Sequence, residues 1–287
     1  MLLESKKKLL MQGNNIMETS NSLMIPEDTN RKMQEYAKLV HDYNKTTNLT
    51  GLKDVESIYN ELVVGSIKPL MNVDVPRGTS FVDIGTGAGI PGIPLILYFG
   101  GNMKGVLIDS NNKKIKFLLH VIDVLGIHDS VTVIQDRVEE MLKEKRYRDS
   151  FNFAVTRAFA HPLMAIEYGL PFVKPGGWLY IYYAVTVYNR DSNDNEGSCC
   201  ETGDMSTHDD AGLYNAIDDD RESDVTAIIQ YLQKHSHALG GHMATREESI
   251  RHKVYEGLLF IKDRPTPINF PRKHAVVKRE VEKLRNI

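Results

Sequence analysis

The stretch FVDIGTGAGIPG, residues 81–92, constrains the fold of this chain more than any other. An apolar run that contains one aspartate leads directly into glycines at positions 85, 87, 89 and 92. This pattern is typical of a buried β-strand that turns sharply into a helix. Turns of this kind hold nucleotide-like cofactors, because glycine lets the backbone approach the ligand closely.

Two cofactors compete for this turn. GAGIPG has the glycine spacing of a dinucleotide site, whereas Gly85, Gly87 and Gly89 give the GxGxG of an adenosyl site. The strand runs straight into Gly85, and counted from there the third dinucleotide glycine falls at Ile90. Pro91 disfavours the helical start that presents amides to a pyrophosphate. The turn therefore favours S-adenosyl-L-methionine, which has no phosphate. The rival, an NAD-type oxidoreductase, lacks a Tyr-x-x-x-Lys pattern here.

Two aspartates accompany the glycines. Asp83 lies inside the apolar strand, where a carboxylate is costly to bury without a partner. One interpretation gives it the cationic methionine end of the cofactor, and the other makes it a partly exposed acid at a strand end. Asp109 closes the run GVLID about 20 residues after the glycines, where a carboxylate accepts hydrogen bonds from ribose hydroxyls.

The rest of the chain predicts an α/β, doubly wound fold. Residues 26–43 and 54–70 have helical periodicity, as do 111–126, which Gly126 ends, and 223–240, which Ser223 or Asp224 caps. Alternating strands and helices make right-handed crossovers and a mostly parallel sheet with helices on both faces. The runs at 242–250 and 253–263 fit an antiparallel pair at one sheet edge. Strands are expected at 80–85, 105–109, 131–135, 151–159 and 177–183.

The domain organisation follows from composition. We expect a flexible leader over 1–25, an N-terminal helical layer over 26–75 and the main domain over 76–287, which ends in a basic tail over 262–287. Residues 189–224 hold twelve acids and two arginines, so we expect a disordered insertion there. The net charge of −3 hides this asymmetry, because the remaining 33 bases and 26 acids carry +7. A basic body suits a polyanionic partner.

Several function classes are disfavoured. No run approaches the roughly 20 apolar residues of a membrane span, so no membrane association is expected. The opening residues make a poor secretory signal. Cys199 and Cys200 are neighbours, which gives no disulfide framework, and with His208 they match no zinc spacing. We therefore predict no metal site and a reducing compartment.

Six ordered motifs give a more specific indication. FVDIGTGAGIPGIPL, LIDSNNKKIKFL, RVEEM and VTRAFA, with NKTTNLTGLKD upstream and PTPINFPR near the end, resemble the RsmG (GidB) family of ribosomal RNA guanine-N7 methyltransferases. The resemblance covers most of residues 26–188 and 225–280. It implies a class I methyltransferase with a seven-stranded Rossmann-like sheet, acting as a monomer on small-subunit (16S-type) ribosomal RNA or the small subunit. The expected location is the cytoplasm, or an organelle of a eukaryote.

The resemblance also implies roles for individual residues. Arg157 would be the catalytic residue, facing the cofactor and the target base. Attack by N7 of guanine needs no general base, because N7 carries a lone pair and no proton. The implied cofactor contacts are Asp83, Gly85, Gly87, Gly89, Ile90, Asp109, Ser110, Val138, Glu139 and Arg157. The implied RNA contacts are Asn44, Lys45, Arg272, Lys273, Lys278 and Arg279.

The chain departs from the family pattern in two places. Tyr183 and Ala184 stand where relatives have a lysine-glycine pair after the fifth strand. Leu62 and residues 65–67 replace a histidine and an Asp-Ser-Leu sequence. These departures support an alternative function, a non-catalytic RNA-binding or ribosome assembly protein with the same fold.

Overall fold

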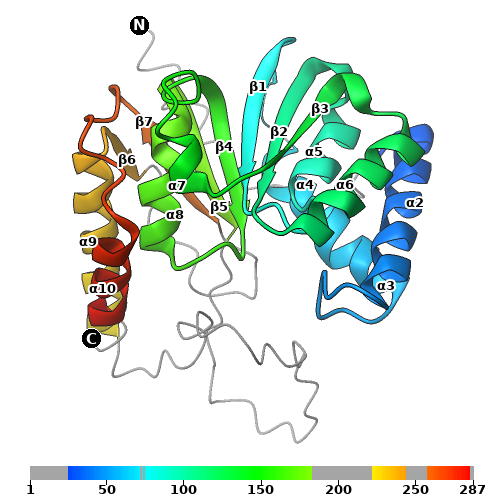
Figure 1. The fold of residues 1–287 in the computed structure, drawn as a ribbon, viewed down its shortest axis with the longest axis horizontal. Coiled ribbons are helices and arrows are strands. Elements are labelled where there is room, and N and C mark those ends of the chain that lie inside the picture. Colours follow the sequence, from blue (N-terminus) through cyan, green and yellow to red (C-terminus); the bar gives the residue numbers. More distant parts are fainter. Residues whose placement is uncertain (1–24, 72, 74, 183–221, 244–256, 285–287) are drawn as a thin grey trace, which may run out of the picture.

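The computed structural model describes residues 25–71, 73, 75–182, 222–243 and 257–284, which form a central sheet with helices on both faces (Figure 1). The seven strands lie in the order β3-β2-β1-β4-β5-β7-β6. Strands β1 to β5 are parallel, and β7 runs antiparallel to both β5 and β6. The strand bounds are β1 Thr79–Ile84, β2 Met103–Asp109, β3 Val131–Gln135, β4 Phe151–Arg157, β5 Val173–Tyr182, β6 Gly241–Met243 and β7 Leu258–Lys262. The predicted α/β, doubly wound class is confirmed.

The helices form two layers (Figure 1). One layer holds the N-terminal helices with α5 and α6, and the other holds α7, α8, α9 and α10. The main helices are α2 Glu27–Asn44, α5 Gly92–Phe99, α6 Asn112–Leu125, α7 Val138–Met141, α8 Pro162–Gly169, α9 Glu222–Ala238 and α10 His274–Leu284. Short 3-10 turns lie at η3 Gly100–Asn102, η4 His128–Ser130 and η5 Leu170–Phe172.

Helix α6 forms as its sequence predicts. The Asn111 side chain accepts a hydrogen bond from the Lys113 amide at 2.9 Å, which caps the first turn. Gly126 ends the helix in the left-handed conformation, with φ of 63°. Helix α9 is described from Glu222 onward and includes Ser223 and Asp224; the side chains of these two residues lie outside the described part, so the predicted cap stays a prediction.

The segment 54–70 is helical but is not the single helix that its periodicity predicts. It divides into α3 Val55–Ser57, η1 Ile58–Val64, α4 Gly65–Ile67 and η2 Lys68–Leu70, and η1 is a π-helix. Ile58 and Val63 are both fully buried although they are five residues apart. A π-helical turn places residues with this spacing on one face, so the wider turn buries both side chains.

The basic segment 262–287 contains a buried lysine and a helix. Lys262 ends β7 and is fully buried, with its Nζ 2.8 Å from the Leu170 carbonyl and 3.0 Å from a carboxylate oxygen of Asp149. From residue 274 the chain forms α10, because Val277, Val281 and Leu284 make a buried stripe with helical spacing. The charged residues of the segment lie between these apolar positions.

A buried carboxylate joins the three helices on this side. Glu167 of α8 is fully buried, and its Oε2 lies 2.7 Å from Nε2 of His235 in α9. The Arg272 guanidinium bonds to the same oxygen at 2.9 Å and to Glu280 of α10 at 2.7 Å. Burial alone raises the pKa of Glu167, but hydrogen bonds from His235 and Arg272 outweigh it and leave this pKa below its ordinary value.

We expect Glu167→Gln to lower the free energy of unfolding by about 2 kcal/mol, because the neutral amide loses charged hydrogen bonds to His235 and Arg272. The stabilisation from ionised Glu167 is fully present above the ordinary pKa of glutamate, and it is lost as the pH falls through the lowered pKa of Glu167. Urea unfolding at pH 7 measures the change. Glu140→Gln, at a side chain that is 49% exposed, is the matched control. Equal losses in both variants would contradict this role.

Candidate functional site

A cavity of about 550 Å³ opens at the carboxyl ends of the parallel strands. It lies where the strand order reverses between β1 and β4, the position at which open α/β sheets bind ligands. Five of the predicted cofactor residues line it: Gly85, Asp109, Ser110, Val138 and Glu139. The others, Asp83, Gly87, Gly89, Ile90 and Arg157, are not among the residues that line it.

The glycine turn takes a conformation that other residues rarely adopt. Gly85, Gly87 and Gly89 have φ of 68°, 58° and 94°. A Cβ on Gly85 would overlap the ring of Phe159, and a Cβ on Gly89 would lie 2.6 Å from Ile93. The turn is fixed by the Thr86 amide, which donates to the Ile108 carbonyl at 2.9 Å. This constrained turn places Gly85 in the lining of the cavity.

Asp109 joins this turn to the end of β2. Its Oδ2 accepts a hydrogen bond from the Gly87 amide at 3.0 Å, and its Oδ1 accepts from the Asn111 amide at 2.8 Å. Lys114 lies 3.7 Å from Oδ2. A carboxylate has about four acceptor positions, so two remain for hydroxyl groups of a ligand in the cavity.

Asp83 lies beneath the turn and not at a partly exposed strand end. It is fully buried, and its Oδ2 accepts hydrogen bonds from the Thr86 hydroxyl at 2.7 Å and the Gly92 amide at 2.9 Å. Its Oδ1 has no hydrogen-bond partner among the described residues. Burial raises the pKa of Asp83 to about 7, although Thr86 and Gly92 act in the opposite direction. The side chain supports the turn from the sheet side.

The N-terminal layer supports the same turn. The Tyr36 hydroxyl of α2 is fully buried and donates to the Ala88 carbonyl at 2.7 Å. Burial raises the pKa of Tyr36 well above its ordinary value, so the hydroxyl stays neutral and able to donate. Ile90 packs into the core beside this contact and is 8% exposed. Helix α2 therefore packs against the glycine turn and helps to hold it in place.

Arg157 ends β4 and reaches toward the N-terminal layer. Its two terminal nitrogens lie 3.2 Å from the Glu61 carbonyl oxygen in the π-helical turn. The next residue, Ala158, has φ of 51° and turns the chain toward the cavity, where Phe159 lies over Gly85. The catalytic role of Arg157 stays a prediction.

The predicted RNA contacts divide into two groups. Lys45, Lys273, Lys278 and Arg279 are exposed, as the prediction requires. Asn44 is used within the protein: its amide donates to the carbonyls of Thr50 and Leu52 and accepts from the amides of Leu49 and Thr50. Arg272 is likewise held by the two carboxylates described above. The prediction assumed that Asn44 and Arg272 are exposed, but both are only partly exposed and are hydrogen-bonded within the protein.

Other residues line the cavity without having been predicted. Lys114, Met164, Tyr168 and His274 are among them. Phe159 also lines the cavity; it lies in the motif VTRAFA, but the sequence alone did not place it next to the glycine turn. Tyr168 and His274 are 106 positions apart and meet only because α10 packs on α8, which no local pattern reveals.

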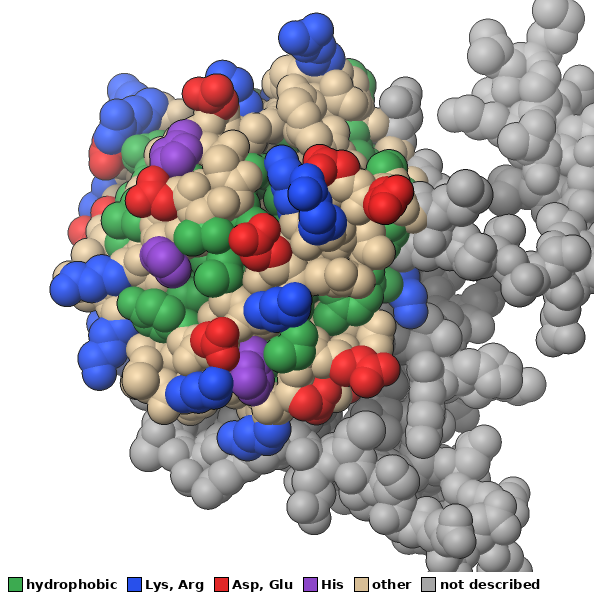
Figure 2. Space-filling view, turned by 90° about the vertical axis from the view of Figure 1, so that its right-hand side faces the viewer, with side chains coloured by type: hydrophobic (Ala, Val, Ile, Leu, Met, Phe, Trp, Pro, Cys, Tyr) green, Lys and Arg blue, Asp and Glu red, His purple; other side chains and the backbone are tan. Residues whose placement is uncertain are grey.

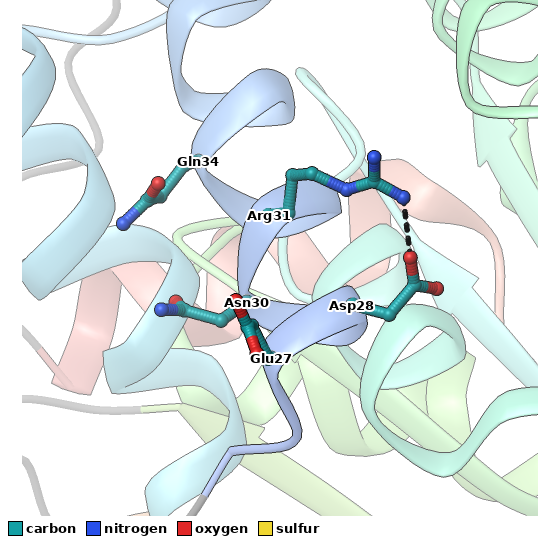
Figure 3. Close-up of a pocket in the computed structure, with 5 residues that line it drawn as sticks. All are labelled: Glu27, Asp28, Asn30, Arg31 and Gln34. Carbon is teal, nitrogen blue, oxygen red and sulfur yellow. Dashed lines mark hydrogen bonds and ion pairs between the residues drawn. The ribbon is translucent and has the colours of Figure 1, made fainter.

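A second hollow lies at the start of α2 (Figure 3), lined by Glu27, Asp28, Asn30, Arg31 and Gln34. All of these side chains come from one helix. Arg31 and Asp28 form an ion pair, and their side chains are 75% and 68% exposed, respectively. This hollow has none of the converging backbone and side-chain groups that line the cavity at the strand ends.

The sequence predicted no metal site and no membrane span. Within the described ranges, no three His, Cys, Asp or Glu side chains gather as a possible metal site, and Cys199, Cys200 and His208 lie outside those ranges. No helix in the described part of the chain is long and apolar enough to cross a membrane.

The strand order with its antiparallel seventh strand, the glycine turn after β1 and the carboxylate ending β2 together define a class I, S-adenosylmethionine-type methyltransferase fold. The model of one family, described as rRNA small subunit methyltransferase G (GidB), matches residues 29–202, and the chain belongs to this family.

Curated relatives agree with this family. The chain is 37% identical over 150 residues to a ribosomal RNA small subunit methyltransferase G of Moorella thermoacetica, covering 52% of this chain and 62% of that protein. The protein of the same name from Dictyoglomus thermophilum is 40% identical over 149 residues, covering 51% and 60%. The chain thus spans about three fifths of the length of these relatives.

Solved structures include a SAM dependent methyltransferase from Aquifex aeolicus, with 19% identity, a TM-score of 0.45, and coverage of 76% of this chain and 95% of that chain.

Proposed function

We propose that this chain transfers a methyl group from S-adenosylmethionine to N7 of a guanine in small-subunit ribosomal RNA. One observation carries the proposal: in a member of this family, Gly85 of the left-handed glycine turn and Asp109 line the same cavity, and the Gly87 amide of that turn donates a hydrogen bond to the Asp109 carboxylate. The proposed partner is the ribosomal RNA or the small subunit, with the chain acting as a monomer in the cytoplasm or in an organelle of a eukaryote.

The residues of the cavity fit the cofactor. A volume of about 550 Å³ is within the usual range for sites that bind ligands of this size. Asp109 would accept hydrogen bonds from the ribose hydroxyls, and Val138 and Glu139 would border the adenine. When bound, the cofactor supplies an electrophilic methyl group on a sulfonium.

The protein's own contribution is alignment. Guanine N7 has a lone pair and no proton, so no side chain has to act as a general base. Fixing the nucleophile and the methyl group in line converts a bimolecular step into an intramolecular one. The fixed glycine turn, supported by Asp83 and Tyr36, is suited to this task.

RNA binding would use exposed cations. Lys45, Lys273, Lys278 and Arg279 are available for phosphate contacts, which release counterions and make affinity fall with salt. The face formed around α2 and α6 does not offer a continuous basic surface, because Figure 2 shows acidic and basic side chains interspersed there. Lys278 borders the cavity itself, so we place the RNA on that side.

A second function is favoured by the altered residues Tyr183 and Ala184. If the lysine of relatives contacts the RNA or the target base, its replacement would leave an RNA-binding protein that assists ribosome assembly without catalysis.

The test is transfer of labelled methyl groups from S-adenosylmethionine to small subunits isolated from a strain without the endogenous enzyme, followed by chain cleavage at N7-methylguanine to locate the site. We expect label at a single guanine. RNA binding with no affinity for S-adenosylhomocysteine would favour the assembly function. Calorimetric binding of NADH, with no binding of S-adenosylhomocysteine, would overturn the cofactor assignment in favour of an oxidoreductase.

A further inference from the structure

The far wall of the cavity is formed by the C-terminal helix. His274, Lys278 and Val281 of α10 line the cavity, at a spacing that puts them on one side of a helix. The family model matches only residues 29–202, so this wall lies outside the matched segment. Four of the residues that line the cavity, His274, Lys278, Val281 and Glu282, therefore belong to a part of the chain that the family model does not match.

This wall is held firmly in place. Val277 and Val281 are buried in the same core as α8. At the start of α10, Arg272 bridges Glu167 of α8 and Glu280 of α10. A side chain on the first turn of α10 is thus fixed relative to the parallel strands, as recognition of a ligand requires.

Tyr168 of α8 fixes the ring of His274. The tyrosine hydroxyl lies 3.0 Å from Nδ1, and the two rings are nearly parallel, with an interplanar angle of 11°. Tyr168 is 1% exposed, and burial, followed by the nearby carboxylates of Glu139 and Glu167, raises its pKa well above the ordinary value. The hydroxyl therefore keeps its proton and must donate it to a neighbour.

Among the described residues, Nδ1 of His274 is the acceptor within hydrogen-bond distance of this hydroxyl, and donation to it selects the tautomer that is unprotonated at Nδ1. A neutral imidazole that accepts at Nδ1 carries its own proton on Nε2, so His274 keeps a second nitrogen as a hydrogen-bond donor. His274 is exposed and lines the cavity, whereas its partner is buried. Buried Tyr168 therefore orients the ring of His274, which is accessible from the cavity.

We propose that His274, oriented by Tyr168, is a recognition residue that donates a hydrogen bond from Nε2 to a ring nitrogen of the cofactor's adenine. Adenine presents unprotonated ring nitrogens as acceptors, and Val281 and Met164 provide apolar surface for its face. The adenine would lie between Val138 and α10, at the opposite end of the ligand from the methionine portion. This inference rests on the proposed function.

The experiment is calorimetric binding of S-adenosylhomocysteine to the full chain and to variants at these two positions. Because one neutral hydrogen bond is removed, we expect His274→Asn to weaken binding by about three- to tenfold. His274→Gln should keep affinity within about twofold, because the longer glutamine places an amide donor near the position of Nε2, while asparagine places it near Nδ1.

The role of Tyr168 is tested through its dependence on His274. Tyr168→Phe should weaken binding about two- to fourfold in the native background and should have no effect once His274 is replaced by Gln. A purely structural role for Tyr168 would give the same loss in both backgrounds and would overturn its assignment as a positioning residue. Lys283→Gln, at an exposed position in the last turn of α10, is the control and should leave affinity unchanged.

The possible failures are distinguishable. If the native chain does not bind S-adenosylhomocysteine, the proposed function itself fails. If the native chain binds it and His274→Asn binds equally well, only the role of His274 fails. If His274→Asn binds the cofactor product normally but loses affinity for small-subunit RNA, the histidine contacts the nucleic acid instead, and the adenine assignment is overturned.

Discussion

Asp109→Ala weakens binding of S-adenosylhomocysteine by about 100-fold or more, the largest loss of cofactor affinity that we expect from a single substitution. The carboxylate would accept both ribose hydroxyls, and each hydrogen bond to a charged group contributes about 1.5–3 kcal/mol. The same side chain also holds the Gly87 amide, so its removal additionally loosens the glycine turn. Calorimetric titration measures the change.

Asp109→Asn is a more conservative change, in which the new NH2 group faces one of the two backbone amides that Asp109 binds. Asparagine keeps one acceptor oxygen, so we expect a loss of about tenfold rather than 100-fold. Asp129→Ala, at an exposed aspartate just before β3, is the control and should bind as the native chain does. Unchanged affinity in Asp109→Ala would remove the central support for the cofactor assignment.

The parts of the fold that were predictable from sequence depend on local patterns. The five parallel strands were recognisable because buried strands in a parallel sheet are continuous apolar runs bounded by turn residues. Helix α6 was predictable to within a residue because Asn111 and Gly126 are strong boundary signals. The glycine turn was predictable because three positive φ angles leave few alternatives to glycine.

The site was less predictable wherever it depends on contacts distant in sequence. Asn44 and Arg272 look like free polar groups in the sequence, yet they satisfy loop carbonyls and a buried carboxylate. The interaction of Tyr168 with His274 requires α10 to lie on α8, and charge patterning suggested a tail there. Side chains of this kind acquire their roles only through packing.

Asp83 shows where sequence reasoning reached the right residue but not its environment. The cost of burying a carboxylate marked it as important, but neither interpretation placed it fully buried beneath the turn. The structure leaves one of its oxygens without a partner among the described residues, and this incomplete solvation is why burial dominates its pKa.

The pH dependence of stability should reveal this protonation. Asp83 has a pKa of about 7 in the folded protein, against about 3.9 for an aspartate in an unfolded chain. Between these pH values the folded state binds a proton that the unfolded state does not. The free energy of unfolding therefore falls as the pH rises from about 4 to about 7, by up to about 4 kcal/mol from this group alone.

Asp83→Asn should abolish this contribution. The amide oxygen still accepts from Thr86 and Gly92, and the variant carries no titratable group at the site. Urea unfolding at pH 4, 5.5, 7 and 8 should show the stability of the variant rising relative to the native chain across this range, because all other titrating groups cancel in the difference. Asp129→Asn, at an exposed position, should give a curve parallel to that of the native chain. A parallel curve for Asp83→Asn as well would mean that Asp83 is ionised throughout, with its second oxygen solvated in solution.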